Sequence, residues 1–212
     1  MDKPTLSRDR IEVAALDLIE GEGLTAFSTR KLAARLGCEA MSIYHYFPSK
    51  GHLMDALVDR VIGNELSVPA NGGGSWRDQV ERAAYEWRGM ALRHPAFFSY
   101  IALHRLNTPT ALRWLDGMLA VMGRSGLSQE LGVRAFRLIG YYLTGAMSDE
   151  TAGYSRGPSA VEQVSDETMQ HDFPRVVAAS HWFAEEQRQA TFDLGLNLLL
   201  DGIERQISPA CQ

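Results

Sequence analysis

The chain has 212 residues, of which 45% are apolar and 22% are charged, and its formal net charge is −5. This length allows one large domain or two small ones, and the composition is ordinary for a soluble globular protein. The negative charge argues against a nucleic-acid affinity that comes mainly from non-specific attraction to the whole molecule.

The cysteines and the chain ends indicate the compartment. Cys38 and Cys211 are far apart in the sequence and predict neither a disulfide framework nor a metal site, which favours a reducing cytoplasm. The N-terminal MDKPTLSRDR is polar and lacks the apolar core of a signal peptide. The apolar run at residues 194–200 is far shorter than the roughly 20 residues that span a bilayer, so we expect no membrane association.

Helical periodicity dominates the N-terminal part, and no convincing strand pattern is present. A first helix is predicted to begin near Ser7 and to end at Gly21–Gly23, and its buried stripe is Ile11, Ala14, Ala15, Leu18 and Ile19. A second helix begins at Ser28 or Thr29 and stops at Gly37, and a third runs to Tyr46. Pro48 prevents its continuation, and Ser49 can cap a fourth helix.

The segment SVPANGGGS, residues 67–75, is the clearest linker. It divides the chain into two predicted domains, residues 1–66 and 67–212. Helices are expected over 76–93, 95–106, 109–123, 128–151, 175–181 and 184–207, with a mobile loop over 152–172. The fold is therefore predicted to be all-α, with a small N-terminal three-helix domain and a larger helical domain behind it.

Two late helices have unusually wide apolar surfaces. Residues 131–146 carry one stripe plus Phe136 and Leu143 at its side, and residues 192–207 carry one stripe plus Leu194 and Leu198. Such surfaces require burial on two sides. We expect a homodimer in which these last two long helices pack against their copies; the alternative is a helix central to a monomer core.

The segment from residue 25 to residue 50 has the order helix, glycine turn, helix, in which the second helix of a helix-turn-helix enters the major groove. Residues 28–50 carry Arg30, Lys31, Arg35 and Lys50 against Glu39, a local charge of +3. This local charge, rather than the net charge of the chain, sets the electrostatic attraction to DNA, because salt screens interactions beyond about 8–10 Å.

The runs AALDLIEGEGLTAFSTRKLAARLG and SIYHYFPSK, followed by LMDAL, resemble the N-terminal domain of the tetracycline-repressor (TetR) family of bacterial transcriptional regulators. The resemblance covers residues 7–63 and implies a dimeric repressor that binds a palindromic operator in double-stranded DNA. It also implies the residues that contact DNA. These are Ala40, Met41, Ser42, Tyr44 and His45 on the reading helix, Thr29 and Arg30 on the helix before it, and Tyr46 and Lys50 at the DNA backbone.

In this family, the C-terminal helices enclose a pocket whose ligand releases the DNA. The resemblance therefore implies a small, hydrophobic effector here. The candidate contacts are aromatic or polar residues on the middle helices, and ordinary core packing is the alternative for each of them. They are Trp87, Phe98, His104, Trp114, Met118, Tyr141, Tyr142 and Met147.

The sequence around His104 is similar to a stretch that, in the tetracycline-repressor subgroup, supplies a histidine to a drug–magnesium chelate. Asp149 falls near the position where that subgroup has a carboxylate from the neighbouring subunit, and Glu150 is the next residue. Two residues do not make a metal site, so we predict no metal and no cofactor.

An enzyme is not predicted, because no nucleophile–base pair, phosphate-binding glycine loop or ligand cluster is recognisable. A helical protein-binding adaptor and a transcriptional activator of the same fold remain as alternatives.

Overall fold

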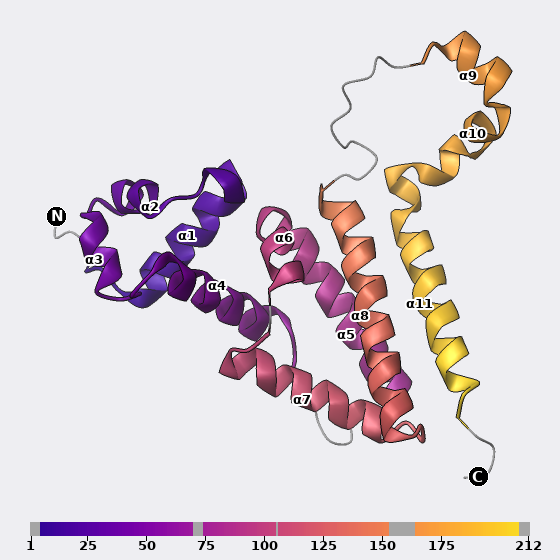
Figure 1. The fold of residues 1–212 in the computed structure, drawn as a ribbon, viewed down its shortest axis with the longest axis horizontal. Coiled ribbons are helices and arrows are strands. Elements are labelled where there is room, and N and C mark those ends of the chain that lie inside the picture. Colours follow the sequence, from indigo (N-terminus) through magenta and orange to yellow (C-terminus); the bar gives the residue numbers. More distant parts are fainter. Residues whose placement is uncertain (1–4, 70–73, 105, 153–163, 208–212) are drawn as a thin grey trace.

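The computed structural model describes residues 5–69, 74–104, 106–152 and 164–207. Within these ranges the chain forms helices and no strand, which confirms the predicted all-α fold (Figure 1). The α-helices and their bounds are α1 (Arg8–Glu22), α2 (Thr29–Leu36), α3 (Ala40–Tyr44), α4 (Lys50–Glu65), α5 (Trp76–Arg93), α6 (Pro95–Leu103), α7 (Pro109–Gly123), α8 (Gln129–Ala152), α9 (Asp166–Asp172), α10 (Pro174–Ala179) and α11 (Arg188–Glu204).

Serine caps begin three of the first four helices. At the start of α1, the side-chain oxygen of Ser7 accepts a hydrogen bond from the backbone N–H of Arg10. The hydroxyl oxygens of Ser28 and Ser49 accept in the same way from backbone N–H groups in the first turns of α2 and α4. Each cap satisfies a backbone donor that the first turn of a helix leaves without a partner. The N-terminal helix starts are therefore encoded locally.

The helix-turn-helix is built around Gly37, which ends α2 in the left-handed conformation with φ of 68°. A side chain there would be strained, so glycine allows the tight turn into α3. The third helix ends at Tyr44, two residues before the predicted end. The chain turns there because Phe47 enters the core completely, while the Tyr46 hydroxyl donates to the carbonyl oxygen of Leu6.

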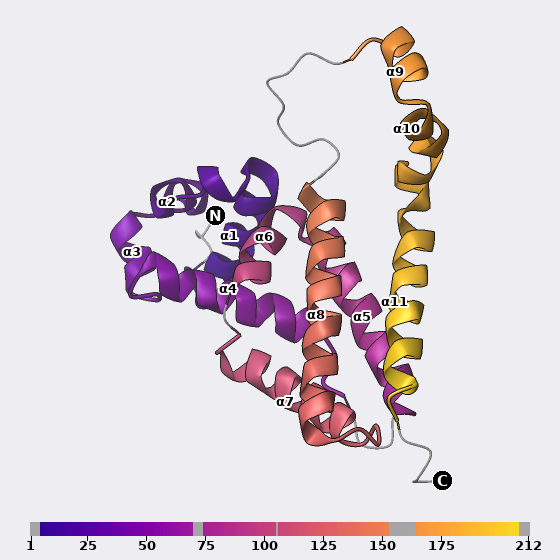
Figure 2. The ribbon, with the colours of Figure 1, turned by 45° about the vertical axis from the view of Figure 1, so that its right-hand side comes forward.

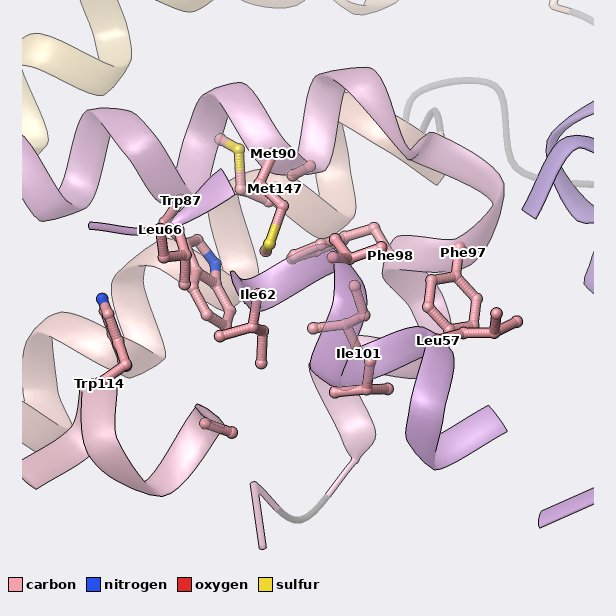
Figure 3. Close-up of a cluster of buried hydrophobic side chains, with 14 of the residues drawn as sticks. Leu57, Ile62, Leu66, Trp87, Met90, Phe97, Phe98, Ile101, Trp114 and Met147 are labelled. Carbon is pink, nitrogen blue, oxygen red and sulfur yellow. The ribbon is translucent and has the colours of Figure 1, made fainter. Parts of the chain in front are cut away.

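Helix α4 belongs to both parts of the molecule. Its buried residues join one hydrophobic core that contains side chains from α1 as well as from α5 to α8 and α11. Figure 3 shows Leu57 and Ile62 of α4 beside Phe97, Phe98 and Trp87 of the C-terminal helices. The two parts are therefore packed together through α4 rather than joined only by the linker.

Polar contacts reinforce this junction. Glu20 of α1 accepts hydrogen bonds from the backbone N–H groups of Ala96 and Phe97, at 3.0 and 3.1 Å, and so caps the start of α6. A carboxylate is favourable there because the first turn of a helix presents free N–H groups and a partial positive charge. The first helix thus holds both α4 and α6.

Helices α8 and α11 run side by side in both ribbon views (Figures 1 and 2). Gly195 permits this close approach, because a Cβ at this position would lie 2.5 Å from the Tyr142 hydroxyl oxygen. That hydroxyl donates to the carbonyl oxygen of Phe192 at 2.7 Å, and burial raises the pKa of Tyr142. The pair forms the outer layer of the C-terminal part.

Part of the predicted loop is helical. Within residues 152–172, Ser165 caps α9, and α10 follows after Phe173; the prediction for residues 153–163 lies outside the described residues. The sequence DETMQHD is short and polar, so its helicity rests on a local cap that the loop-like composition concealed.

Two other predicted boundaries were wrong. Helix α6 ends at Leu103, because His104 is extended. Helix α11 begins at Arg188, after a 3₁₀ turn over Glu185–Gln187. In the part of the chain that the structure describes, no helix has the length and hydrophobicity to cross a membrane.

Candidate functional site

The first turn of α3 presents small and flexible side chains to solvent. Met41 is 65% exposed, Ala40 and Ser42 are half-buried, and Ile43 is buried on the opposite side of the helix. Small side chains allow the helix to approach base edges, and a methionine can contact a thymine methyl group. Three of the five residues predicted on the reading helix are therefore at least partly accessible on its first turn.

A hydrogen bond between the Tyr44 hydroxyl and Thr29 Oγ1, at 3.1 Å, joins α3 to the start of α2. Both residues are predicted DNA contacts, and the structure brings them together. Arg30 and His45 are exposed beside them. Tyr44 therefore also orients the two helices relative to one another.

Tyr46 is placed differently from the prediction. Its ring packs against the core, and its hydroxyl donates its proton to the carbonyl oxygen of Leu6 at 2.7 Å. Since a hydroxyl has a single proton, this bond leaves only acceptor lone pairs, which do not suit a phosphate oxygen. In this geometry the backbone contact predicted for Tyr46 is not available to its hydroxyl.

Lys50 opens α4 and is exposed. Its ammonium donates to the carbonyl oxygen of Phe27 at 3.2 Å and lies 5.2 Å from the centroid of the Phe27 ring. An ammonium has three donors, so this contact positions the group and leaves donors for an anion. Its place beside the N-terminus of α4 favours a phosphate at the same point.

The local charge is smaller in the fold than in the sequence. Lys31 pairs with Glu22 at 2.7 Å, and Arg35 lies 3.9 Å from Asp17. Both partners are on α1, outside the segment whose charge was counted as +3. Arg30 and Lys50 are the cations of this segment without a carboxylate partner among the described residues.

A cavity of about 1110 Å³ lies among α5, α6, α7 and α8. Trp87 and Trp114 are stacked in its wall with ring centroids 5.9 Å apart, and Phe136 lies 6.4 Å from Trp114. The lining residues are Val80, Ala83, Ala84, Trp87, Ile101, Ala102, His104, Leu106, Asn107, Leu112, Trp114, Leu115, Met118, Leu119, Val133, Phe136, Arg137, Ile139, Gly140, Tyr141, Leu143 and Thr144. A volume of this size and a largely apolar wall suit a small organic ligand.

Five of the eight predicted ligand contacts line this cavity: Trp87, His104, Trp114, Met118 and Tyr141. The other three lie elsewhere.

Phe98 and Met147 are completely buried in the core, as Figure 3 shows, and Tyr142 faces α11. These three side chains therefore pack against other parts of the protein rather than line the cavity. The sequence did not separate them from the cavity residues, because helical periodicity alone does not distinguish a core face from a cavity face.

His104 joins the cavity to α4. Its Nε2 lies 2.8 Å from the Asp55 carboxylate, and its Nδ1 is buried without a hydrogen-bond partner. A second contact of the same kind is made by Asp59, which accepts from the backbone N–H and the hydroxyl of Thr110 at 3.0 and 2.9 Å. These two contacts join His104 of the cavity wall and Thr110 of α7 to the helix that carries the DNA-reading unit.

The indole N–H groups of Trp87 and Trp114 are also buried without partners. A buried donor that makes no hydrogen bond costs about 1–3 kcal/mol. Together with His104 Nδ1, three polar atoms of cavity-lining side chains are therefore enclosed without a hydrogen bond.

The residues considered for a drug–magnesium chelate have other partners within this chain. His104 is engaged by Asp55, and Glu150 forms a buried ion pair with Arg88 at 2.9 Å. Over the described ranges, no three histidine, cysteine or carboxylate side chains are grouped as metal ligands.

The sequence-based prediction of the cavity did not include three residues of α8, namely Arg137, Gly140 and Thr144. With Tyr141 they recur on one face of α8 at intervals of three and four residues. That stripe of small and polar residues within an apolar helix is visible in the sequence and is the signal that could have identified this wall.

The exposed α3 within a helix-turn-helix and the cavity-bearing helices behind it define a DNA-binding protein with a ligand domain. Residues 11–57 match the family described as bacterial regulatory proteins, tetR family, and residues 68–207 match the tetracyclin repressor-like C-terminal domain. The second match alone covers more than half of the chain, so the chain belongs to the TetR family and is a transcriptional repressor.

Named relatives agree with this assignment. The chain is 30% identical to the transcriptional repressor DrrR1 of Streptomyces coeruleorubidus over 95% of this chain and 78% of that protein. It is also 30% identical to the class A tetracycline repressor from transposon 1721 of Escherichia coli, over 91% and 88%. The structure of ActR from Streptomyces coelicolor in complex with (S)-DNPA has a TM-score of 0.74 and 25% identity, over 96% and 98%.

Proposed function

We propose that this repressor acts as a homodimer on a palindromic operator and is released when a small hydrophobic effector occupies the cavity among α5 to α8. We also propose a cytoplasmic location, where the operator DNA is present. The single observation that carries the release mechanism is the contact of the cavity-wall residue His104 with Asp55 of α4, beside which Thr110 of α7 contacts Asp59.

The dimer is supported by the outer surfaces of α8 and α11. Leu138 is 47% exposed, and Leu194 and Leu198 are each 61% exposed, although all three lie on long, well-packed helices. Leu194 and Leu198 are four residues apart and so lie on one face of α11. An apolar face of this kind is the usual contact between copies of a helical protein.

The release step is a population shift. In one conformation of the dimer the two α3 helices match the spacing of the operator half-sites, and in the other they do not. A ligand that binds the second conformation more tightly lowers the operator affinity by the ratio of its affinities for the two conformations. That ActR has been crystallised with (S)-DNPA supports a ligand role for the corresponding domain here.

The direct test is to select random DNA duplexes with the purified full-length protein. We expect a palindrome whose half-sites are centred about one helical turn apart or slightly more. Absence of any enriched sequence would overturn the operator proposal.

The release proposal is tested with Gly140→Leu, which places a side chain in open space on the cavity wall. The variant should bind the operator but respond less to any ligand of the cavity. Gly21→Leu in α1, where a Cβ also meets nothing within 4 Å, is the control. An undiminished response of Gly140→Leu would show that the effector binds elsewhere.

A further inference from the structure

The cavity has an uneven charge distribution. Among the described residues that line it, Arg137 is the one with a permanent charge, and no aspartate or glutamate is present. Arg137 is exposed, so solvent screens its charge, but an anionic group of a ligand there would meet a cation and no carboxylate of the cavity wall. This points to a negatively charged ligand.

Arg137 differs in its contacts from other arginines of the C-terminal part. Arg134, one turn away, pairs with Glu130 at 2.7 Å, and Arg88 pairs with Glu150. Arg137 instead donates through Nε to the Tyr141 hydroxyl, and its guanidinium lies 5.3 Å from the centroid of that ring. Because no carboxylate among the described residues pairs with it, its planar fork can take a carboxylate with two parallel hydrogen bonds.

The other polar groups of the wall also require acceptors. Trp87 and Trp114 have buried indole N–H groups without partners, and an indole nitrogen can only donate. Both nitrogens have almost no accessible surface, so a ligand of the cavity meets the indole rings rather than their N–H groups. The stacked indoles additionally favour a flat aromatic ring system.

There is room for such a ring next to Arg137. Gly140 lies one turn along α8 and lines the cavity, and a Cβ at this glycine would meet no atom within 4 Å. A larger residue there would project from the same face as Arg137 and Tyr141. The absence of a side chain therefore keeps the space beside the guanidinium open.

We propose that the effector is a planar aromatic acid whose carboxylate binds Arg137 and whose rings pack against the indole rings of Trp87 and Trp114. This inference rests on the proposed function, since it names the ligand class of the same cavity. Tyr141 is a positioning residue that holds the guanidinium through its hydroxyl and its ring.

Calorimetric titration with two compounds of nearly equal shape tests this proposal. Anthraquinone-2-carboxylate should bind about fivefold more tightly than anthraquinone-2-carboxamide, as expected for a charge pair with an exposed arginine. Arg137→Gln should reduce the affinity for the carboxylate to that for the amide and leave the amide unchanged. Arg137→Lys should restore part of the preference.

Arg134→Gln is the matched control, because it removes an arginine of the same helix that does not line the cavity. Its preference for the acid should equal that of the wild type. Equal binding of acid and amide by the wild type, or a preference that survives Arg137→Gln, would overturn the acid class while leaving the cavity as a ligand site.

Failure of both compounds to bind would also overturn the acid class as proposed. A thermal-shift screen of uncharged compounds on the same preparation then separates the two ideas. If a neutral compound binds and releases the operator, the proposed function stands without the acid preference. If no compound affects operator binding, the proposed function fails as well.

Discussion

The DNA-reading unit and the cavity differ in how their polar groups are arranged. In the reading unit, Tyr44 is bonded to Thr29, Tyr46 to Leu6 and Lys50 to Phe27. In the cavity wall, two indole nitrogens and one imidazole nitrogen have no partners. The polar groups of the reading unit are therefore fixed by bonds within it, whereas three polar atoms of the cavity wall are enclosed without a bond at a cost in stability.

Helix α4 connects these two regions through carboxylates one turn apart, Asp55 and Asp59. A packed helix moves as a unit, so a shift at either carboxylate repositions the reading unit at its other end. The comparison therefore predicts that changes in the cavity alter operator binding without touching DNA, and that changes in α3 alter DNA choice without affecting the ligand.

The largest effect is expected from separating the two copies. Leu194→Glu combined with Leu198→Glu places charges on the exposed apolar face of α11 and should yield a monomer. Operator affinity should fall by more than about 100-fold, because the second half-site is then no longer bound at high effective concentration. Sedimentation and operator titration measure the two consequences.

Leu103→Glu is the control for this change. Leu103 is 90% exposed on α6, so a charge there alters neither the core nor α11. A double variant that stays dimeric and binds the operator normally would show that α11 is not the interface.

A smaller effect is expected at the DNA backbone. Lys50→Ala should weaken binding to all operator variants by about tenfold, the loss expected for a charge-assisted hydrogen bond. It should also reduce the salt slope by about one. Lys31→Ala, which removes a cation already paired with Glu22, should change the slope less. An unchanged slope for Lys50→Ala would remove its phosphate role.

The smallest change in affinity is expected at Met41. Met41→Ala should change the preferred base at one position of each half-site while affinity for the best site falls by less than about tenfold. Duplex selection with the variant measures this. If all operators weaken equally, Met41 does not read bases.

The sequence predicted the reading unit well because its signals are local. The caps at Ser7, Ser28 and Ser49 and the turn at Gly37 depend on neighbours within a few residues. Charge was predicted less well, since Lys31 and Arg35 are paired with acids of α1 that are distant in sequence. The end of α3 likewise depends on the tertiary contact of Tyr46.

The cavity could be predicted only in part. Aromatic composition identified Trp87, Trp114 and Tyr141, but equally selected Phe98, which is in the core. Which face of a helix meets a core and which meets a cavity is decided by how four helices pack together. Arg137 was missed because a single arginine on a helix normally indicates a solvated face.

The most direct test of the coupling through α4 is a complete thermodynamic cycle of operator and ligand on the dimer. The tightest cavity ligand from a thermal-shift screen should weaken operator binding by a factor between about 5 and 150, and the operator should weaken ligand binding by the same factor. Asp55→Asn should lower both factors together. A ligand that fills the cavity and leaves operator affinity unchanged would contradict the account.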